Sequence, residues 1–103
     1  MDFETATRNK IGITTLVLNN GVMATYPVGG PSDFPTAREK SGVGTMTGNY
    51  ADFARSFGAH GIQVNKLSEL APALETAKGL NISGKTVLID VRTTPVSKRG
   101  YKA

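Results

Sequence analysis

An Asn-Asn-Gly sequence at residues 19–21 follows directly after the apolar run of residues 13–18, ITTLVL. Amide and carbonyl oxygens are hard ligands of the kind that Mg²⁺ accepts, usually together with phosphate oxygens. Parallel α/β sheets bind ligands at the carboxyl ends of their strands. Asn-Gly is also a strong signal for a tight turn. Two interpretations are therefore open, a turn and a ligand site at a strand end, and these three residues alone favour the turn.

Three other groups have simpler explanations than catalysis. A catalytic histidine needs a partner and a cleft, so we interpret His60, between an expected helix and strand, as a surface loop residue. Asp90 lies within the apolar run VLIDV, where we expect a buried, hydrogen-bonded carboxylate. Residues 42–44, Gly-Val-Gly, lack both a preceding strand and the Lys-Ser/Thr pair of a phosphate loop, which favours a flexible lid.

The composition describes an ordinary soluble domain. The chain has 103 residues, 39% hydrophobic and 19% charged, which predicts a single domain. The absence of cysteine excludes a disulfide framework and a thiolate metal site. The sequence contains no apolar run of about 20 residues, and its acidic start does not resemble a signal peptide. These features predict a cytoplasmic protein with no membrane partner.

The net charge of +4 does not indicate a nucleic-acid partner. Three of the basic residues, Lys98, Arg99 and Lys102, fall in the last six residues. The sequence shows no basic helix face and no aromatic platform interleaved with the charges, as nucleic-acid binding would require. We expect residues 96–103 to form a flexible basic tail.

Alternating helices and strands predict the architecture. Expected helices cover residues 2–10, 49–57 and 67–79, and expected strands cover residues 11–18, 61–64 and 86–92. Asn49 is a good N-cap for the second helix and Gly58 a good stop. Tyr50, Phe53 and Phe57 share one face of it, which predicts core packing. Leu67, Leu70, Ala71, Leu74 and Ala77 give the third helix its apolar face.

Pro72 lies inside the third helix and is compatible with it only if the helix starts at about residues 67–69, so that the proline falls in the first turn. Gly79 is the expected end of this helix.

The order of elements predicts an α/β fold: a three-layer α/β/α arrangement with a short parallel sheet and helices on both faces. The run VLIDV looks central, and GIQV, with Gln63, looks like an edge strand, so the last strand should lie between the first and the second. The first strand is almost continuously apolar, which predicts cover on both faces. Its free edge is uncharged, which predicts pairing with another chain or with a preceding strand.

Three blocks of sequence, in this order, resemble a known family. DFETATRNKIGITTLVLNN, NYADFARSFGAHGIQV and LSELAPALETAKGLNISGKTVLIDV are similar to the end of the diphosphate-binding domain of thiamine-diphosphate-dependent enzymes, nearest to the acetolactate-synthase-like branch. The resemblance covers roughly residues 2–94. It implies that residues 1–95 are the carboxyl-terminal portion of a thiamine-diphosphate-binding domain.

The resemblance also implies roles for residues 20–24. Asn20 and the backbone carbonyl of Val22 would bind Mg²⁺, which bridges to the diphosphate of the cofactor. Gly21 would let the backbone turn between them. Met23 and Ala24 would lie near thiamine diphosphate. No residue of this chain is assigned a catalytic role.

The family's Gly-Asp-Gly segment, which brings the acidic magnesium ligand, is missing from this sequence, as is the activating glutamate. We therefore expect a segment of an enzyme that acts on 2-oxo acids, as a decarboxylase or carboligase, and that is inactive alone. A homo-oligomer or a companion subunit would supply the rest. The alternative is a non-catalytic association subunit or relic that dimerises through its exposed first strand.

Overall fold

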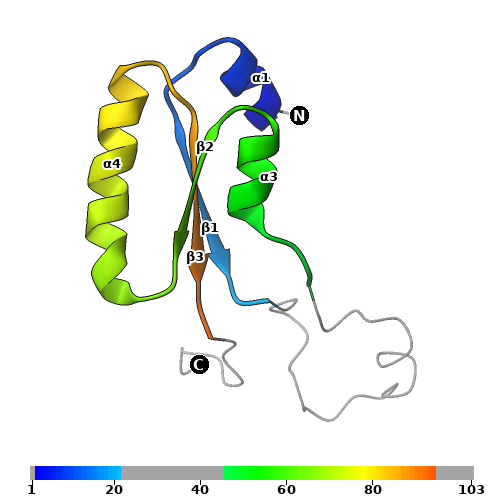
Figure 1. Ribbon diagram of the computed structural model, residues 1–103, viewed down its shortest axis with the longest axis vertical. Helices are drawn as coiled ribbons and strands as arrows, with labels where there is room; N and C mark the ends of the chain where they lie inside the picture. Colours follow the sequence, from blue (N-terminus) through cyan, green and yellow to red (C-terminus); the bar gives the residue numbers. More distant parts are fainter. Residues whose placement is uncertain (1, 22–45, 95–103) are drawn as a thin grey trace, which may run out of the picture. The chain divides into compact units, whose positions relative to one another are not determined.

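The computed structural model describes residues 2–21 and 46–94. Val22, Met23 and Ala24, the Gly-Val-Gly of residues 42–44 and the predicted tail of residues 96–103 lie outside this part. The chain divides into two compact units: Met1–Asn19 with Asn49–Arg92, and Asn20–Gly48 with Thr93–Ala103. All the elements in Figure 1 belong to the first unit: α1 (Asp2–Arg8), β1 (Thr14–Asn19), α3 (Tyr50–Ser56), β2 (His60–Val64), the 3₁₀ turn η1 (Leu67–Glu69), α4 (Leu70–Ile82) and β3 (Val87–Arg92).

The three described strands form one parallel sheet in the order β1-β3-β2. Leu16 and Ile62 both pair with Ile89 of the central strand. The predicted order is confirmed, and so is the edge position of β2, whose Gln63 is exposed. The carboxyl ends of β1 and β3 therefore meet at one edge of the sheet.

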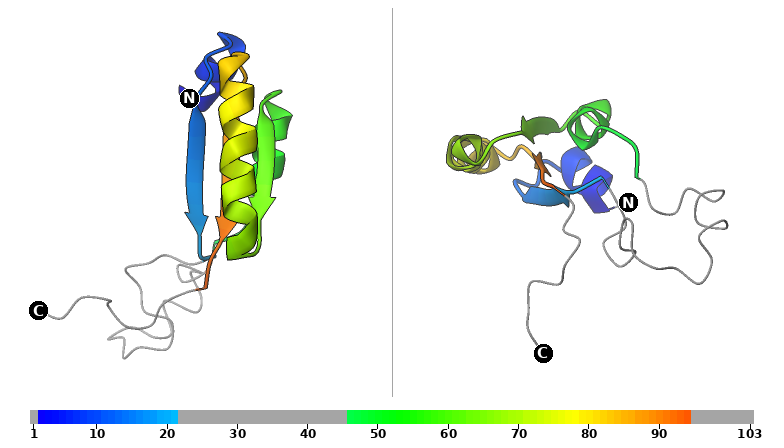
Figure 2. Two further views of the ribbon diagram at one scale, coloured as in Figure 1. Left: turned by 90° about the vertical axis from the view of Figure 1, so that its left-hand side faces the viewer. Right: turned by 90° about the horizontal axis from the view of Figure 1, so that it is seen from below.

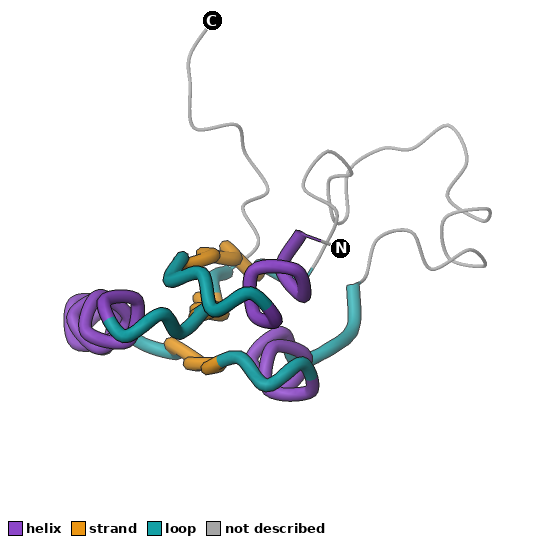
Figure 3. The backbone as a smooth tube through the Cα atoms, turned by 90° about the horizontal axis from the view of Figure 1, so that it is seen from above, coloured by secondary structure: helices purple, strands orange, loops and turns teal. Residues whose placement is uncertain are grey.

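Helices cover both faces of this sheet. The views along the strands place α4 on one side and α1 with α3 on the other (Figures 2 and 3). The two faces of β3 separate the core accordingly: Val87 and Ile89 pack with α4, whereas Leu88 packs with α3. The predicted three-layer α/β/α arrangement is confirmed.

The face that α4 buries differs from the predicted one. Leu67 is 87% exposed and Leu74 is 44% exposed. Two of the predicted residues, Leu70 and Ala77, do pack against the sheet, and Ala73 and Leu80 join them in place of Leu67 and Leu74. The α-helix proper starts only at Leu70, after the 3₁₀ turn, and two alanines at its centre let the helix lie close to the sheet. The prediction gave all apolar residues of the helix equal weight, although the alanines lie where the helix comes closest to the sheet.

Pro72 and Gly79 show how the limits of α4 are set. Pro72 is the third residue of α4 and so lies in the first turn, as predicted. Backbone N–H groups in the first turn have no intrahelical acceptor, so a proline there costs no helical hydrogen bond. Gly79 does not end the helix, which continues to Ile82. Glycine costs a helix interior about 1 kcal/mol. Burial of Leu80 against the core offsets that cost, and Gly84, at φ 82°, follows the helix instead.

The ends of α3 agree with the sequence. The Asn49 side chain accepts a hydrogen bond from the Asp52 backbone N–H at 3.1 Å, as an N-cap does. Gly58 follows the helix with φ 82°, in the left-handed region.

The buried residues of α3 are alanines, because the helix and the sheet approach each other closely. A Cβ on Gly61 of β2 would lie 2.1 Å from the Ala51 carbonyl oxygen, so only small side chains fit between the elements. Ala51 and Ala54 are buried, whereas Phe53 is 45% exposed and packs edge-to-face on Phe57. The prediction that the aromatic stripe forms the core is therefore wrong at Phe53.

Two further predictions are wrong. His60 is the first residue of β2 rather than part of a loop, and its N–H donates to the Thr86 carbonyl at 3.0 Å. β1 is covered on one face only by the described residues: Val17 packs with the α3 side, but Leu16 and Leu18, on the opposite face, are 45% and 69% exposed. Within the described ranges, no helix combines the length and the apolar character needed to cross a membrane.

Candidate functional site

The Asn-Asn-Gly sequence lies where the chain leaves the carboxyl end of β1. Asn19 is the last residue of β1, and Asn20 and Gly21 follow it. Within the described strands β1 pairs with the parallel strand β3. The position of the Asn-Asn-Gly sequence is that of a ligand site in a parallel α/β sheet.

The two asparagines have different surroundings. Asn19 is only 8% exposed, and its Nδ2 donates to Oδ1 of Asp90 at 3.0 Å. Asn20 is half-buried and begins the second unit. Asn19 therefore belongs to the sheet, and Asn20 is the first residue beyond it.

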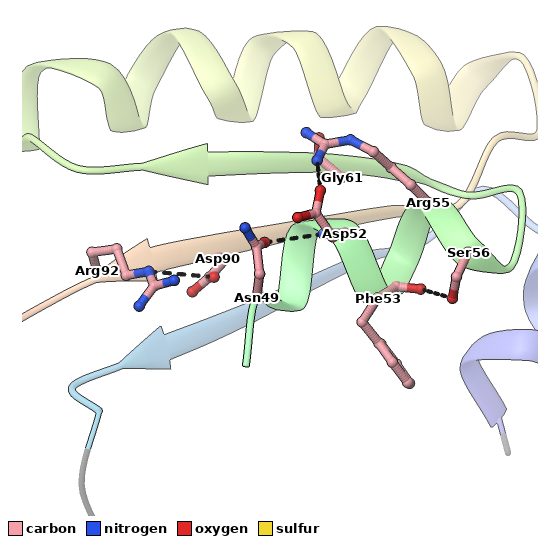
Figure 4. A network of polar contacts seen from close by, with 8 residues as sticks. All are labelled: Asn49, Asp52, Phe53, Arg55, Ser56, Gly61, Asp90 and Arg92. Atoms are coloured by element: carbon pink, nitrogen blue, oxygen red, sulfur yellow. Dashed lines mark hydrogen bonds and ion pairs between the residues drawn. The ribbon is translucent and has the colours of Figure 1, made fainter. Parts of the chain in front are cut away.

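Asp90 is completely buried near the end of β3. Its Oδ1 accepts the hydrogen bond from Asn19, and the Arg92 Nε lies 3.5 Å from its Oδ2 (Figure 4). Among the described residues Oδ2 has no hydrogen-bond partner. The Arg92 side chain is 37% exposed. The prediction of a buried, hydrogen-bonded Asp90 is confirmed, with one carboxylate oxygen left to an ion pair alone.

The register of the sheet brings these three side chains together. Asn19 pairs with Arg92, and Asp90 pairs with Val17, two residues before Asn19. Side chains two residues apart lie on the same face of a strand, so Asn19, Asp90 and Arg92 share the face that α3 covers. Asn19 and Asp90 are diagonal neighbours, a spacing that long polar side chains can bridge.

The contact between Asn19 and Asp90 was not predicted, although each residue was considered separately. They are 71 positions apart in the sequence. The sequence did contain one indication of this contact, because both residues lie near the carboxyl ends of strands that were predicted to be neighbours. The register needed to pair them comes only from the assembled sheet.

Gly21 has a left-handed backbone conformation. Its φ is 71°, in the left-handed region that glycine adopts most easily, and an added Cβ would meet nothing within 4 Å. Its carbonyl accepts a hydrogen bond from the Met46 N–H at 2.8 Å, within the second unit. Glycine is therefore required here by φ and not by space.

The described donor set fits half of a magnesium site. Asn20 offers a neutral amide oxygen at the expected strand end, and Val22, the other predicted ligand, lies outside the described residues. The described ranges contain no group of three or more histidine or acidic residues that could hold a metal ion. A neutral amide and a carbonyl compensate poorly for the dehydration of Mg²⁺. An anionic ligand from elsewhere would complete the site.

Two open hollows in the described residues lie away from this edge. One, of about 380 Å³, lies between β2 and α4 and includes His60 and Glu69. The other, of about 400 Å³, includes Lys10 and Lys85 near the start of β3. Neither is lined by Asn19 or Asp90, so neither extends the candidate site.

Comparisons with known proteins show which family this chain is similar to. The family model "Thiamine pyrophosphate enzyme, C-terminal TPP binding domain" matches residues 1–91. The chain is 36% identical over 94 residues to a protein of Bacillus subtilis (strain 168) named "Putative thiamine pyrophosphate-containing protein YdaP". That alignment covers 87% of this chain and 15% of the relative. No solved structure matches the chain significantly.

Proposed function

Since the chain belongs to the thiamine pyrophosphate (thiamine diphosphate) enzymes, as part of their C-terminal cofactor-binding domain, we propose that it works as a segment of a Mg²⁺-dependent enzyme. We assign the enzyme to the acetolactate-synthase-like branch, acting on 2-oxo acids as a decarboxylase or carboligase. The main support is the position of Asn20, directly after the carboxyl end of β1 in a parallel sheet.

The role of this segment is to hold the metal and the diphosphate. The Asn20 amide oxygen and the Val22 carbonyl would bind Mg²⁺, and Met23 and Ala24 would lie against the cofactor. Gly21 contributes the left-handed backbone conformation between the two ligands. Thiamine diphosphate, when bound, supplies the carbanion chemistry next to a carbonyl group.

The chain alone is inactive in this proposal. The amide oxygen of Asn20 and the carbonyl of Val22 are neutral ligands. The relative whose name mentions thiamine pyrophosphate extends far beyond this segment, which covers 15% of it. The acidic metal ligand and the activating glutamate come from another part of the enzyme, in a second copy or a companion subunit.

Calorimetry with thiamine diphosphate and Mg²⁺ tests this proposal. The chain alone should show no low-micromolar binding, and such binding would contradict its dependence on a partner. Adding a polypeptide that carries the family's Gly-Asp-Gly segment should produce binding. In that complex Asn20→Ala should weaken binding by about tenfold or more, equivalent to about 1.4 kcal/mol. Asn65→Ala is the matched control, because Asn65 is exposed after the carboxyl end of β2. Equal effects of both variants would refute the assignment.

The exposed face of β1 supports a second candidate function, association of two copies. β1 lies at the edge of the described sheet, TTLVLN carries no charge, and Leu18 is 69% exposed. Charged side chains are a common device against edge pairing, and β1 has none. In this proposal the β1 strands of two copies pair across a two-fold axis, which makes one continuous sheet.

Sedimentation at about 0.1 mM tests association, since an interface with micromolar affinity would be populated there. The chain should sediment as a dimer, and Leu18→Lys should convert it to a monomer. Leu67→Lys, at an 87% exposed leucine outside the sheet, is the control and should leave the dimer intact. A monodisperse monomer of the unmodified chain would exclude self-association.

A further inference from the structure

We propose that Asp90 is a positioning residue for the magnesium ligand. It holds the side chain of Asn19 and thereby fixes the point at which the chain leaves β1 for Asn20. This inference rests on the proposed function, because it concerns the residue that we assign to the metal. Asp90 itself touches neither metal nor cofactor in this proposal.

The hydrogen bond between Asn19 and Asp90 is buried and strong enough to hold Asn19 in place. Asn19 is 8% exposed and Asp90 is 0% exposed, and 3.0 Å separates the Asn19 Nδ2 from the Asp90 Oδ1. A hydrogen bond to a carboxylate is stronger than one between neutral groups, and burial strengthens it further. The bond also sets the orientation of the Asn19 amide, since only Nδ2 can donate. Asn19 is covalently bonded to Asn20, so fixing Asn19 fixes where the metal-binding segment starts.

Packing alone does not account for Asp90. The apolar Leu88 lies on the same face of β3, two residues earlier, in the core cluster that includes Val17. An apolar side chain at position 90 would continue that cluster and avoid the desolvation of a carboxylate. Replacing buried ionic groups with apolar ones of similar volume often stabilises a protein. Asp90 instead has one oxygen with no hydrogen-bond partner in the described structure. The hydrogen bond to Asn19 therefore gives a reason for a carboxylate at position 90 in spite of its desolvation cost.

Arg92 completes the arrangement by facing the second oxygen. Its Nε lies 3.5 Å from Oδ2 of Asp90, and its backbone pairs with Asn19 in the register of the sheet. Asp90 therefore lies between two donors, one on β1 and one on its own strand. An asparagine at position 90 could accept from Asn19, but its NH₂ group would then face the Arg92 guanidinium, donor against donor.

That donor conflict suggests a pair of variants. Asp90→Leu removes the acceptor for Asn19 and keeps the branched shape of the side chain. Asp90→Asn combined with Arg92→Gln keeps an acceptor for Asn19 and replaces the guanidinium with a group whose carbonyl can accept from the new amide. Asp52→Asn is the control, because Asp52 also pairs with an arginine, Arg55, but on the exposed surface of α3 (Figure 4).

The first measurement uses the full-length chain without ligand. In NMR spectra of ¹⁵N-labelled protein the backbone amide signals of Asn20 and Gly21 should change their chemical shifts in Asp90→Leu. This change should occur whether or not the variant also alters the stability of the fold. They should stay at the wild-type positions in the double variant and in Asp52→Asn. If Asp90→Leu leaves these signals in place, or the double variant moves them as far as Asp90→Leu does, the positioning role is refuted. If Asp90→Leu fails to fold, the double variant tests the positioning role by itself: shifted Asn20 and Gly21 signals in it would refute that role.

The second measurement is made on the complex of the chain with the polypeptide that carries the Gly-Asp-Gly segment. Mn²⁺ is added as a paramagnetic probe together with thiamine diphosphate, and line broadening detects binding even at roughly millimolar affinity. Signals near Asn20 should broaden in the wild type and the double variant. Asp90→Leu should need about tenfold more Mn²⁺ for the same broadening. Equal Mn²⁺ dependence of wild type and Asp90→Leu would refute the positioning role. No broadening near Asn20 in the wild type would refute the proposed function instead, and the ligand-free signals would still decide whether Asp90 positions Asn20.

Discussion

The two ends of β1 and β3 use polar side chains in opposite ways. At the amino end, Asn81 at the end of α4 accepts from the Thr14 hydroxyl at 2.6 Å and donates to the carbonyls of Ile13 and Lys85 at 3.0 and 2.9 Å. The Thr86 hydroxyl donates to the Ile11 carbonyl at 2.7 Å. Together these hydrogen bonds join the end of α4 and the residues before β3 to the residues at the start of β1.

At the carboxyl end, Asn19 and Asp90 form one buried hydrogen bond, and among the described residues Oδ2 of Asp90 has an ion pair with Arg92 but no hydrogen bond. The amino end therefore uses its polar groups to hold the elements together. The carboxyl end keeps a buried charge that an apolar side chain would avoid. This difference agrees with the general division in parallel α/β proteins, where ligands bind at the carboxyl ends of the strands.

The largest effect should come from Gly12→Ala at the amino end. An added Cβ would lie 2.0 Å from the Asn81 carbonyl oxygen, which is backbone and cannot move aside cheaply. We expect a loss of more than about 3 kcal/mol in the free energy of unfolding, or no folded protein. Urea unfolding followed by circular dichroism measures this loss. A loss below about 1 kcal/mol would mean that the amino end is not closely packed.

Asn81→Ala should have the next largest effect. It removes one acceptor and two donated hydrogen bonds and leaves the Thr14, Ile13 and Lys85 groups to find other partners. We expect a loss of about 2 kcal/mol, since partial exposure allows water to replace some of the bonds. Asn65→Ala is the control in the same urea titration and should be nearly neutral. Similar losses in both variants would remove the contrast between the two ends.

Arg92→Gln alone should cost less, about 1 kcal/mol, because the arginine side chain is 37% exposed and its Nε is 3.5 Å from the carboxylate. The loss should disappear largely when Asp90→Leu is also present, which a double-mutant cycle in urea measures. Additive losses would show that Arg92 acts independently of Asp90.

Gly79→Ala should give the smallest change and the opposite sign. Gly79 lies inside α4, and an added Cβ would meet nothing within 4 Å. We expect stabilisation by about 0.5–1 kcal/mol from helix propensity. The same urea titration compares it directly with Gly12→Ala. Destabilisation by Gly79→Ala would indicate that α4 packs differently from the arrangement described.

Much of the fold follows from local patterns in the sequence. The N-cap Asn49, the stop at Gly58, the parallel sheet with the last strand in the middle and the position of Pro72 were all predicted. The start of the first strand was not: β1 begins at Thr14 instead of residue 11. Lys10 has a φ of 55°, and Gly12 packs against the end of α4, so residues 10–12 serve the connection between elements.

The inward faces of the helices could be predicted only in part from apolar spacing. The buried residues of α3 and α4 are alanines, while Phe53 and Leu74 remain exposed. Hydrophobic periodicity weights large side chains, but close helix–sheet approach selects small ones. The distance between the two backbones, which Gly61 allows to be short, is a tertiary property.

The sequence by itself determined the family, the order of the elements and the placement of Asn-Asn-Gly after a strand, because each of these depends on residues that are close together in the chain or on the order of the blocks. Only the tertiary structure decided that Asn19 and Asp90 meet. A shift of one residue in the register between β1 and β3 would turn one of the two side chains to the opposite face. That register is set by the packing of the whole sheet, and no local pattern contains it.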